Sequence, residues 1–119
     1  MVTRRTGRVH MNILSGNKID NEEETVYESG IAGNAGVALA IIKRSEPHFH
    51  RKMTEYYMVD TGKGMLFLDG ERVPLQQGDV VKIEPNTMHH VESKDGIYIW
   101  VVTLPPFDIK DLHRVDQKH

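Results

Sequence analysis

The chain has 119 residues, no cysteine and a formal net charge of −2 at pH 7. This length suits one domain that buries a core of its own. The lack of cysteine excludes disulfides, zinc–thiolate sites, iron–sulfur clusters and cysteine nucleophiles, and the charge balance gives no reason to expect nucleic acid as a partner. The seven histidines are therefore the first indication of function.

Residues 1–24 are expected to form an N-terminal arm with a first strand, ending in the acidic linker Asn21–Glu24. Three early arginines follow no clear period, so residues 1–12 are either a solvated tail or a nucleic-acid contact. The basic start is not followed by the apolar stretch of a signal peptide, and no apolar run approaches the roughly 20 residues that cross a bilayer. We therefore expect a soluble, cytoplasmic protein without a membrane partner.

The segment Ser29–Gly36 is rich in glycine and is predicted to be a loop. Its glycines superficially resemble a phosphate-binding loop, but that motif requires a strand before it and a helix after it. Here the following segment, Val37–Ile42, is a short apolar run that is typical of a strand. We therefore do not expect a nucleotide-binding loop.

From residue 37 onward, short runs rich in Val, Ile, Tyr and Phe alternate with turn signals about every ten residues, which is typical of an all-β sandwich or barrel. Asp69-Gly70 predicts a two-residue hairpin turn between Met65–Leu68 and Arg72–Leu75, because both central positions of a type I′ turn need positive φ. Another turn is expected at Lys94–Gly96. The predicted fold class is all-β with little helix.

The end of the chain contains one more strand and little else. Ile97–Leu104 is apolar on both faces, which predicts an interior strand that is covered on two sides. Residues 108–119 are expected to form a C-terminal tail with a short helical turn around Asp111–His113. His113 and His119 are most simply tail residues.

The pair His48 and His50 is the central observation. Side chains two apart in a strand share a face, so this spacing directs both imidazoles into one small volume. Glu55 then opens an otherwise apolar run, and a carboxylate on a buried face is costly unless it is paired or bound to a cation. Two alternatives stay open: the histidines are solvent-exposed, or Glu55 is solvated at a strand end or paired with Arg51 or Lys52.

His89 and His90 supply a further imidazole. Neighbouring strand residues face opposite ways, so only one of the two can join the cluster. Three imidazoles and one carboxylate form a mixed nitrogen and oxygen site, which suits Fe, Mn, Ni, Cu or Zn and argues against calcium or magnesium. The predicted cofactor is one divalent transition metal ion per chain.

The spacing of these residues resembles the two motifs of the cupin superfamily. The first motif, G-x5-H-x-H-x(3,4)-E-x6-G, matches through His48, His50, Glu55 and Gly62. The second, G-x5-P-x-G-x2-H-x3-N, starts at Gly78 and places its histidine at His89 rather than His90. The resemblance covers about residues 35–104. The remaining motif positions depart from the pattern, and they hold Ile42, Glu84, Asn86 and Ser93.

This resemblance to small single-domain cupins implies a double-stranded β-helix, or jelly-roll barrel, over residues 25–107. It also implies that His48, His50, Glu55 and His89 are the metal ligands. None of the departing positions is a ligand, so the departures concern turn geometry, and Asn86 tolerates the positive φ of the glycine that it replaces.

Three further residues are candidates for substrate contact. Tyr57 shares the parity of Glu55 and is a candidate catalytic and substrate-binding residue, although an aromatic wall is the simpler role. Met65 and Phe67 are expected to line the barrel, which makes Phe67 a candidate for substrate binding. Arg44 has the parity of His48 and could bind a substrate carboxylate or phosphate.

The function that this resemblance implies is a metalloenzyme acting on a small organic acid or sugar derivative. Dioxygenases, isomerases or tautomerases, lyases and decarboxylases all occur among similar cupins, and the sequence does not select among them. The alternative is a non-catalytic module that binds a sugar or another small ligand. We expect a homodimer, because the apolar strand Ile97–Leu104 supplies surface that a single barrel does not cover.

Overall fold

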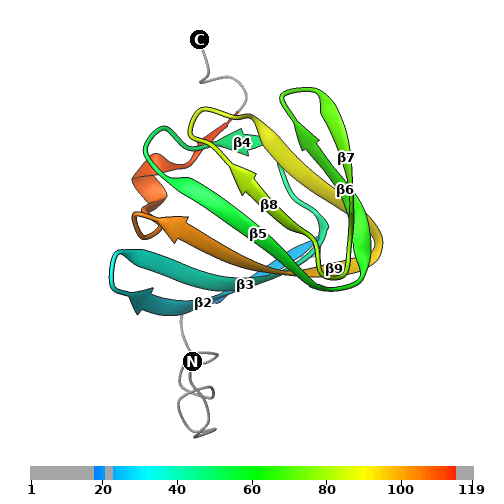
Figure 1. Ribbon diagram of the computed structural model, residues 1–119, viewed down its shortest axis with the longest axis horizontal. Helices are drawn as coiled ribbons and strands as arrows, with labels where there is room; N and C mark the ends of the chain where they lie inside the picture. The colour runs from blue at the N-terminus through cyan, green and yellow to red at the C-terminus, as the bar shows by residue number, and fades with distance from the viewer. Residues whose placement is uncertain (1–17, 21–22, 115–119) are drawn as a thin grey trace, which may run out of the picture.

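The structure is a computed structural model that describes residues 18–20 and 23–114 (Figure 1). Its strands lie in chain order at β1 Lys18–Asp20, β2 Glu24–Ala32, β3 Ala35–Arg44, β4 His48–Phe49, β5 Thr54–Thr61, β6 Lys63–Leu68, β7 Glu71–Gln76, β8 Val80–Ile83, β9 His89–Leu104 and β10 His113–Arg114. The one helical segment in this part of the chain is a 3-10 turn, η1, at Ile109–Asp111. Among the described residues, no helix is long and apolar enough to cross a membrane.

The strands form one strongly curled sheet around a common interior, so the fold is the expected all-β jelly-roll barrel (Figure 1). β9 is its central strand, and it pairs antiparallel with β3, β4, β5 and β6. The meander β1–β2–β3, the β5–β8 pair and the β6–β7 hairpin extend the sheet from there. A 16-residue strand can serve four neighbours because its two halves belong to different walls of the barrel.

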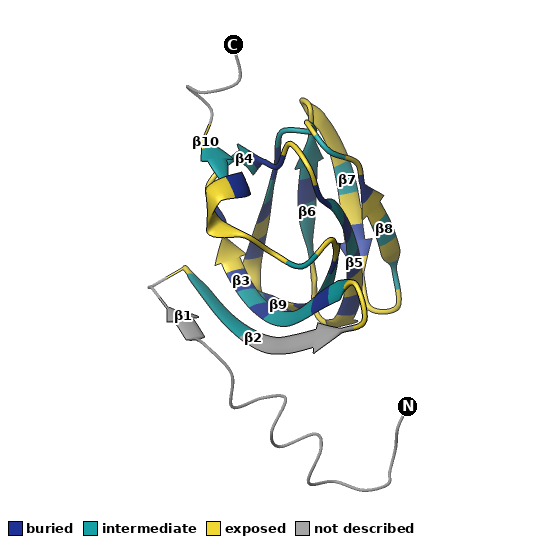
Figure 2. Cartoon of the chain, turned by 90° about the vertical axis from the view of Figure 1, so that its left-hand side faces the viewer, coloured by how far each residue is buried: buried dark blue, intermediate teal, exposed yellow. Residues whose placement is uncertain are grey.

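Strict alternation along the strands directs one set of apolar side chains into the barrel. Ile97, Ile99, Val91 and Leu66 are completely buried, and the inward side chains of β3, β5, β7 and β8 pack against them. In Figure 2 the buried positions recur as dark bands along the strands. Burying a side chain of this size contributes about 1.5–3 kcal/mol. The barrel interior is therefore the single hydrophobic core of the described chain.

The outer face of β9 is only partly covered, which corrects the expectation of cover on both sides. Tyr98 and Leu104 are each 41% exposed. Met58 and Val80 lie on the same outer face, because Met58 pairs with Trp100 on one side and with Val80 on the other. Within one chain, this strip of apolar side chains faces water.

The predicted Asp69-Gly70 hairpin is confirmed. The two residues have φ angles of 46° and 89° and connect β6 to β7. The turn expected at Lys94–Gly96 is wrong, because β9 continues through these residues. They instead form a bulge: the register against β3 shifts between Ile97 and Glu92, and Gly96 has a φ of 95°.

The loop expected at Ser29–Gly36 is also wrong. Most of it belongs to the β2–β3 hairpin, whose turn contains Gly33 with a φ of 62°. Gly36 is in β3, where a Cβ atom would lie 2.6 Å from Thr103 Oγ1 and 3.1 Å from the Cα of Pro106. Close approach of neighbouring chain segments therefore explains this glycine, and the strand ladder outweighs the low strand propensity of glycine.

Both ends of the described chain take part in the barrel. Glu24, which the sequence placed in a linker, begins β2, and residues 1–17 lie outside the described part. The helical turn occupies residues 109–111 rather than 111–113, because the Asp108 side chain accepts a hydrogen bond from the Lys110 backbone N–H and begins it there. His113 pairs with Phe49 in β4 and is not a tail residue, whereas His119 lies outside the described residues.

Candidate metal centre

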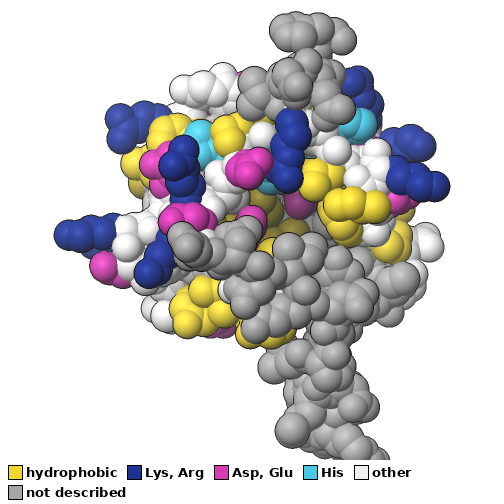
Figure 3. Space-filling view, turned by 180° about the vertical axis from the view of Figure 1, so that it is seen from behind, with side chains coloured by type: hydrophobic (Ala, Val, Ile, Leu, Met, Phe, Trp, Pro, Cys, Tyr) yellow, Lys and Arg dark blue, Asp and Glu magenta, His cyan; other side chains and the backbone are white. Residues whose placement is uncertain are grey.

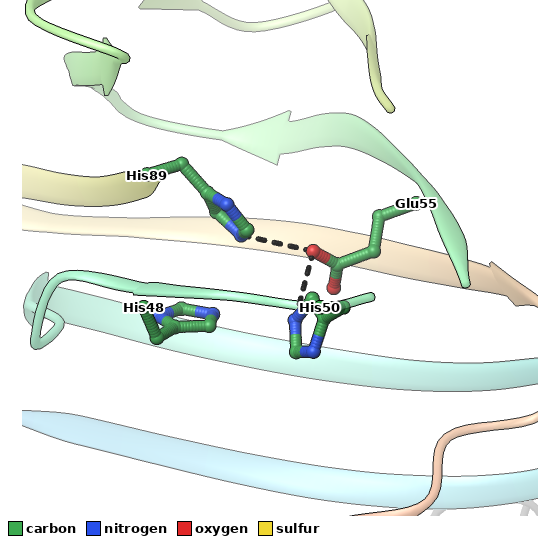
Figure 4. A group of neighbouring side chains, drawn as sticks. All are labelled: His48, His50, Glu55 and His89. Atoms are coloured by element: carbon green, nitrogen blue, oxygen red, sulfur yellow. Dashed lines mark ion pairs between the residues drawn. The ribbon is translucent and has the colours of Figure 1, made fainter. Parts of the chain in front are cut away.

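Four side chains that could bind a metal ion meet inside the barrel (Figure 4). His48 is in β4, His50 directly follows that strand, Glu55 is in β5 and His89 begins β9. One nitrogen or oxygen atom of each side chain lies within 4.8 Å of the corresponding atoms of the other three. His48 is half-buried and the other three are buried. The structure thus brings together all four predicted ligands.

Strand register explains why these side chains converge. His48 and His89 are direct partners in the β4–β9 pair, and their ring centroids are 4.3 Å apart. The ring of His50 lies 5.0 Å from that of His48, as expected for residues two apart on one face. Oε1 of Glu55 lies 2.9 Å from Nε2 of His89 and 3.3 Å from Nε2 of His50 (Figure 4, dashed lines).

Each histidine ring is oriented by its Nδ1 atom, which points away from the cluster. The partners of Nδ1 are the backbone carbonyl oxygens of Glu46 for His48 (2.7 Å), Asp111 for His50 (2.9 Å) and Thr87 for His89 (2.8 Å). A carbonyl oxygen only accepts, so each Nδ1 carries a proton and donates it. In a neutral ring Nε2 then has no proton, and its lone pair faces the cluster.

The cluster therefore needs a positive charge at its centre. In the described chain, Nε2 of His50, Nε2 of His89 and Oε1 of Glu55 are buried without hydrogen-bond partners. When neither Nε2 carries a proton, the short distances from these atoms to Oε1 of Glu55 are not hydrogen bonds. The nitrogen lone pairs then face the carboxylate directly, which is unfavourable unless a proton or a metal ion lies between them. Donors on opposite sides of one transition metal ion lie about 4 Å apart, because each bond is about 2 Å long. The observed separations and the donor set fit such an ion.

The pKa values of these groups follow from the same crowding. Burial, together with His89, lowers the pKa of His48 from 6.5 to about 3. For His50, burial lowers the pKa, but Glu55 and the Asp111 carbonyl outweigh it and the pKa is raised. Burial also opposes ionisation of Glu55, yet the two histidines beside its carboxylate outweigh burial and hold its pKa well below the usual range. The carboxylate is thus charged, and it attracts either a proton or a metal ion.

Tyr57 lies beside the cluster. It is buried in the interior, and its ring centroid is 6.1 Å from that of His89 in an edge-on arrangement. Burial, followed by the charges of Glu55 and Glu24, raises its pKa well above 10. The hydroxyl therefore remains protonated and is able to donate a hydrogen bond. The sequence placed this residue on the correct face.

Two polar residues of the interior were missed by the sequence interpretation. Thr103 is the register partner of Glu55, and its buried hydroxyl has no hydrogen-bond partner within the described chain. Glu24 is opposite Ile42 in the β2–β3 pair, so it shares the inward face of Ile42. Burial raises the pKa of Glu24, with Arg114 lowering it and Glu46 raising it further. Thr103 could have been noticed as a lone hydroxyl in an apolar strand.

Two predicted residues lie away from the cluster. Phe67 is the register partner of His90, and the two rings stack on the outer face with centroids 4.4 Å apart. The expectation that Met65 and Phe67 line the barrel is therefore wrong. Arg44 is exposed at the end of β3, and its role in substrate binding stays a prediction. It borders a groove of about 740 Å³ that is lined by Glu23, Lys43, Arg44, Met65, Glu92, Ser93 and Lys94.

Surface charge gives no second indication of a binding site on the face opposite the view of Figure 1. There, the described Lys and Arg side chains lie among Asp and Glu side chains, with hydrophobic and histidine side chains between them (Figure 3). Among the described residues of this face, charges of the two signs are mixed. The interior cluster therefore remains the candidate site.

Comparison with known proteins shows the family. Residues 39–102 match the model of the cupin domain, so the chain belongs to the cupin family. It is also similar to an uncharacterised protein of Aquifex aeolicus (strain VF5), with 32% identity over 97 residues that span 80% of each chain. An uncharacterised protein of Methanocaldococcus jannaschii is 29% identical over 66 residues, which span 54% of this chain and 53% of that protein.

Solved structures of similar fold include several enzymes. Streptomyces Pac13, described as a unique nucleoside dehydratase, aligns with a TM-score of 0.75 and 21% identity over 87% of both chains. A variant of it has been solved with uridine. KdgF from a Halomonas species aligns with a TM-score of 0.70 and 18% identity over 79% of this chain and 90% of its own. The ectoine synthase of P. lautus aligns at 0.71 with 13% identity over 95% of this chain and 88% of its own. These similarities show the shared barrel.

Proposed function

We propose that this cupin is a metal-dependent enzyme that acts on a small organic molecule. The reaction is either elimination of a group from that molecule or its isomerisation. The observation that supports the proposal most is the convergence of three imidazole lone pairs on one buried carboxylate. In this proposal His48, His50, Glu55 and His89 hold one divalent transition metal ion. When bound, the ion would supply a Lewis acid for a substrate oxygen or, if it is redox-active, electron transfer with dioxygen.

Two titratable side chains on the inward face of the barrel favour elimination or isomerisation over chemistry at the metal alone. Glu24 has a raised pKa and can take a proton from carbon in its ionised form, or give one to a departing hydroxyl group in its neutral form. Tyr57 keeps its proton and can hold a substrate oxygen by hydrogen bonding. The similarity to a nucleoside dehydratase supports the same class of reaction.

The proposal is tested by offering the protein, loaded in turn with Fe, Mn, Ni, Cu or Zn, a panel of hydroxy acids, keto acids, sugar derivatives and nucleosides that includes uridine. Mass spectrometry of the products separates the reaction classes. A product that has lost water identifies a lyase. A product of unchanged mass but altered chromatographic retention identifies an isomerase. Gain of oxygen identifies an oxygenase and loss of carbon dioxide a decarboxylase. Saturable binding without turnover by every metal form would instead favour a binding module.

For a substrate that is turned over, Glu24→Gln is expected to lower kcat by about 10²–10⁴-fold, the usual contribution of a general acid or base. Tyr57→Phe should lower kcat/KM, and Tyr56→Phe is its matched control. Tyr56 is the register partner of Val102 and faces outward, so its hydroxyl is outside the interior. Full activity of Glu24→Gln would remove Glu24 from the mechanism.

We also propose that the protein is a homodimer through the outer strip of β5, β8 and β9. Val80 is 64% exposed there and lies beside Met58, and Tyr98 is exposed on β9 on the same face. A second copy is the occupant that fits, because two-fold pairing places this apolar strip against itself. Lys82, the partner of Tyr56, adds one charge at its edge.

Size-exclusion chromatography with light scattering tests the dimer. The wild type is expected to have the mass of two chains, and Val80→Glu the mass of one. Ile109→Glu is the matched control, since Ile109 is 63% exposed but lies in η1, away from the strip. A monomeric wild type would disprove the pairing.

A further inference from the structure

One carboxylate from the end of the chain holds the loop that connects two of the proposed metal ligands. Oδ1 of Asp111 accepts a hydrogen bond from the backbone N–H of Arg51 at 2.8 Å. Its Oδ2 accepts from the backbone N–H groups of Lys52 at 3.1 Å and Met53 at 3.2 Å. These three residues lie between His50 and Glu55 in the sequence, so the side chain of Asp111 fixes the path between the two ligands.

The backbone of the same residue holds the ring of His50. The carbonyl oxygen of Asp111 accepts the Nδ1 proton of His50 at 2.9 Å, from 61 residues away in the sequence. This bond determines which nitrogen carries the proton and how far the ring is rotated, so it aims Nε2 at the cluster. Asp111 therefore acts on His50 twice, once through the ring and once through the loop that follows it.

The residues after Asp111 attach the segment to the ligand strand itself. β10 pairs antiparallel with β4, where His113 is opposite Phe49 and Arg114 is opposite His48 (Figure 2). The rings of His113 and Phe49 also stack, with centroids 5.2 Å apart. Residues 108–114, which we term the C-terminal clasp, thus lie along the whole His48–Met53 stretch.

Asp111 is suited to this task by its surroundings. It is 7% exposed, and a buried carboxylate that accepts three backbone N–H groups makes charge-assisted hydrogen bonds that are stronger than neutral ones. By contrast, Asp108 at the start of the clasp is exposed, and the hydrogen bond it accepts comes from Lys110 within η1. Asp111 therefore binds the loop between two proposed ligands, whereas Asp108 binds only a backbone group of its own segment.

We infer that Asp111 is a positioning residue for metal binding, and that docking of the C-terminal clasp and occupation of the metal centre stabilise each other. The inference rests on the proposed metal site. Groups that orient metal-binding histidines typically contribute 10–100-fold to metal affinity. The two equilibria are linked thermodynamically. If docking of the clasp raises the metal affinity by a given factor, metal binding raises the equilibrium constant for docking by the same factor.

The test measures zinc affinity by competition with a chromophoric chelator, below the melting temperature of each variant. Asp111→Ala is expected to bind zinc about 10–100-fold more weakly than the wild type. Asp111→Asn keeps one acceptor oxygen, so it should recover part of the loss even where the alanine variant folds poorly. Asp108→Asn, the matched control, should bind zinc like the wild type.

Two further measurements separate positioning from general stability. In a His50→Ala background, titrated to zinc concentrations that load the three remaining ligands, Asp111→Ala should weaken zinc binding by much less than it does alone, because its target ring is missing. Hydrogen exchange on the wild type should show that zinc protects the amides of residues 51–53 and 113–114. A variant that is merely destabilised would lose affinity equally in both backgrounds.

The outcomes distinguish this inference from the proposed function. A wild type that binds no transition metal would overturn the metal site and this inference with it. A wild type and an Asp111→Ala variant of equal zinc affinity would overturn the positioning role alone. Equal loss with and without His50 would show that Asp111 does not act through that ring.

Discussion

His89→Ala is expected to abolish stoichiometric metal binding, while His90→Ala leaves it unchanged. The two residues are adjacent, but they face opposite sides of β9: His89 is 1% exposed inside the barrel, and the ring of His90 stacks on Phe67 outside. Elemental analysis of the purified variants, repeated on His50→Ala and Glu55→Ala, checks the prediction. Full metal content in His89→Ala would rule out the proposed ligand set.

The variants that remove a proposed ligand should lose the stability that metal provides. A ligand present at about 1,000 times its Kd stabilises the folded state by about 4 kcal/mol. In a domain of this size that raises Tm by on the order of 15 °C. Thermal unfolding of the wild type and of His90→Ala should show this increase when metal is added after chelation. His89→Ala should show almost none.

Gly62→Ala is expected to destabilise the barrel strongly, although the residue lies outside the metal centre. Gly62 has a φ of 92°, and an added Cβ would lie 2.8 Å from the carbonyl oxygen of Gly96 and 3.3 Å from the Cα of Ile97. The left-handed backbone costs about 1–2 kcal/mol for alanine, and overpacking against a backbone that cannot move away adds about 1–3 kcal/mol. We expect a loss of about 3 kcal/mol in the free energy of unfolding.

Gly78→Ala separates these two costs. Gly78 has a φ of 91°, almost the same as Gly62, but an added Cβ there would meet no atom within 4 Å. The alanine variant should therefore lose only the conformational part, about 1 kcal/mol. Urea denaturation at equal m-values measures both variants. Equal losses would mean that the approach of Gly62 to the bulge at Gly96 has no energetic consequence.

The parts of the molecule that the sequence predicted well are those set by short-range rules. The Asp69-Gly70 turn follows from the φ angles that a tight hairpin demands. The grouping of His48, His50 and Glu55 follows from strand parity and from motif spacing within a few residues. His89 was chosen over His90 by the spacing of the second motif. Asn86 has a φ of 66°, as expected at the glycine position of that motif.

The parts that were missed depend on pairing between distant strands. β6 is apolar at Met65, Leu66, Phe67 and Leu68, so its alternation does not reveal the inward face. Its register with β9, where Leu66 is opposite Val91, does so. The inward direction of Glu24 likewise follows from its pairing with Ile42. The role of Asp111 depends on contacts with residues 58–61 positions away.

The pairing of His48 with His89 also determines when the metal centre can form during synthesis and folding of the chain. His48, His50 and Glu55 leave the ribosome early, whereas His89 and the clasp follow only after β6, β7 and β8 have been synthesised. Bringing such distant strands together is the slow part of forming a barrel, because the chain entropy of the long loops must be overcome first. The ion proposed for this site would find no complete set of four ligands on a nascent chain. It would prolong the life of the finished barrel and would not guide the search that leads to it.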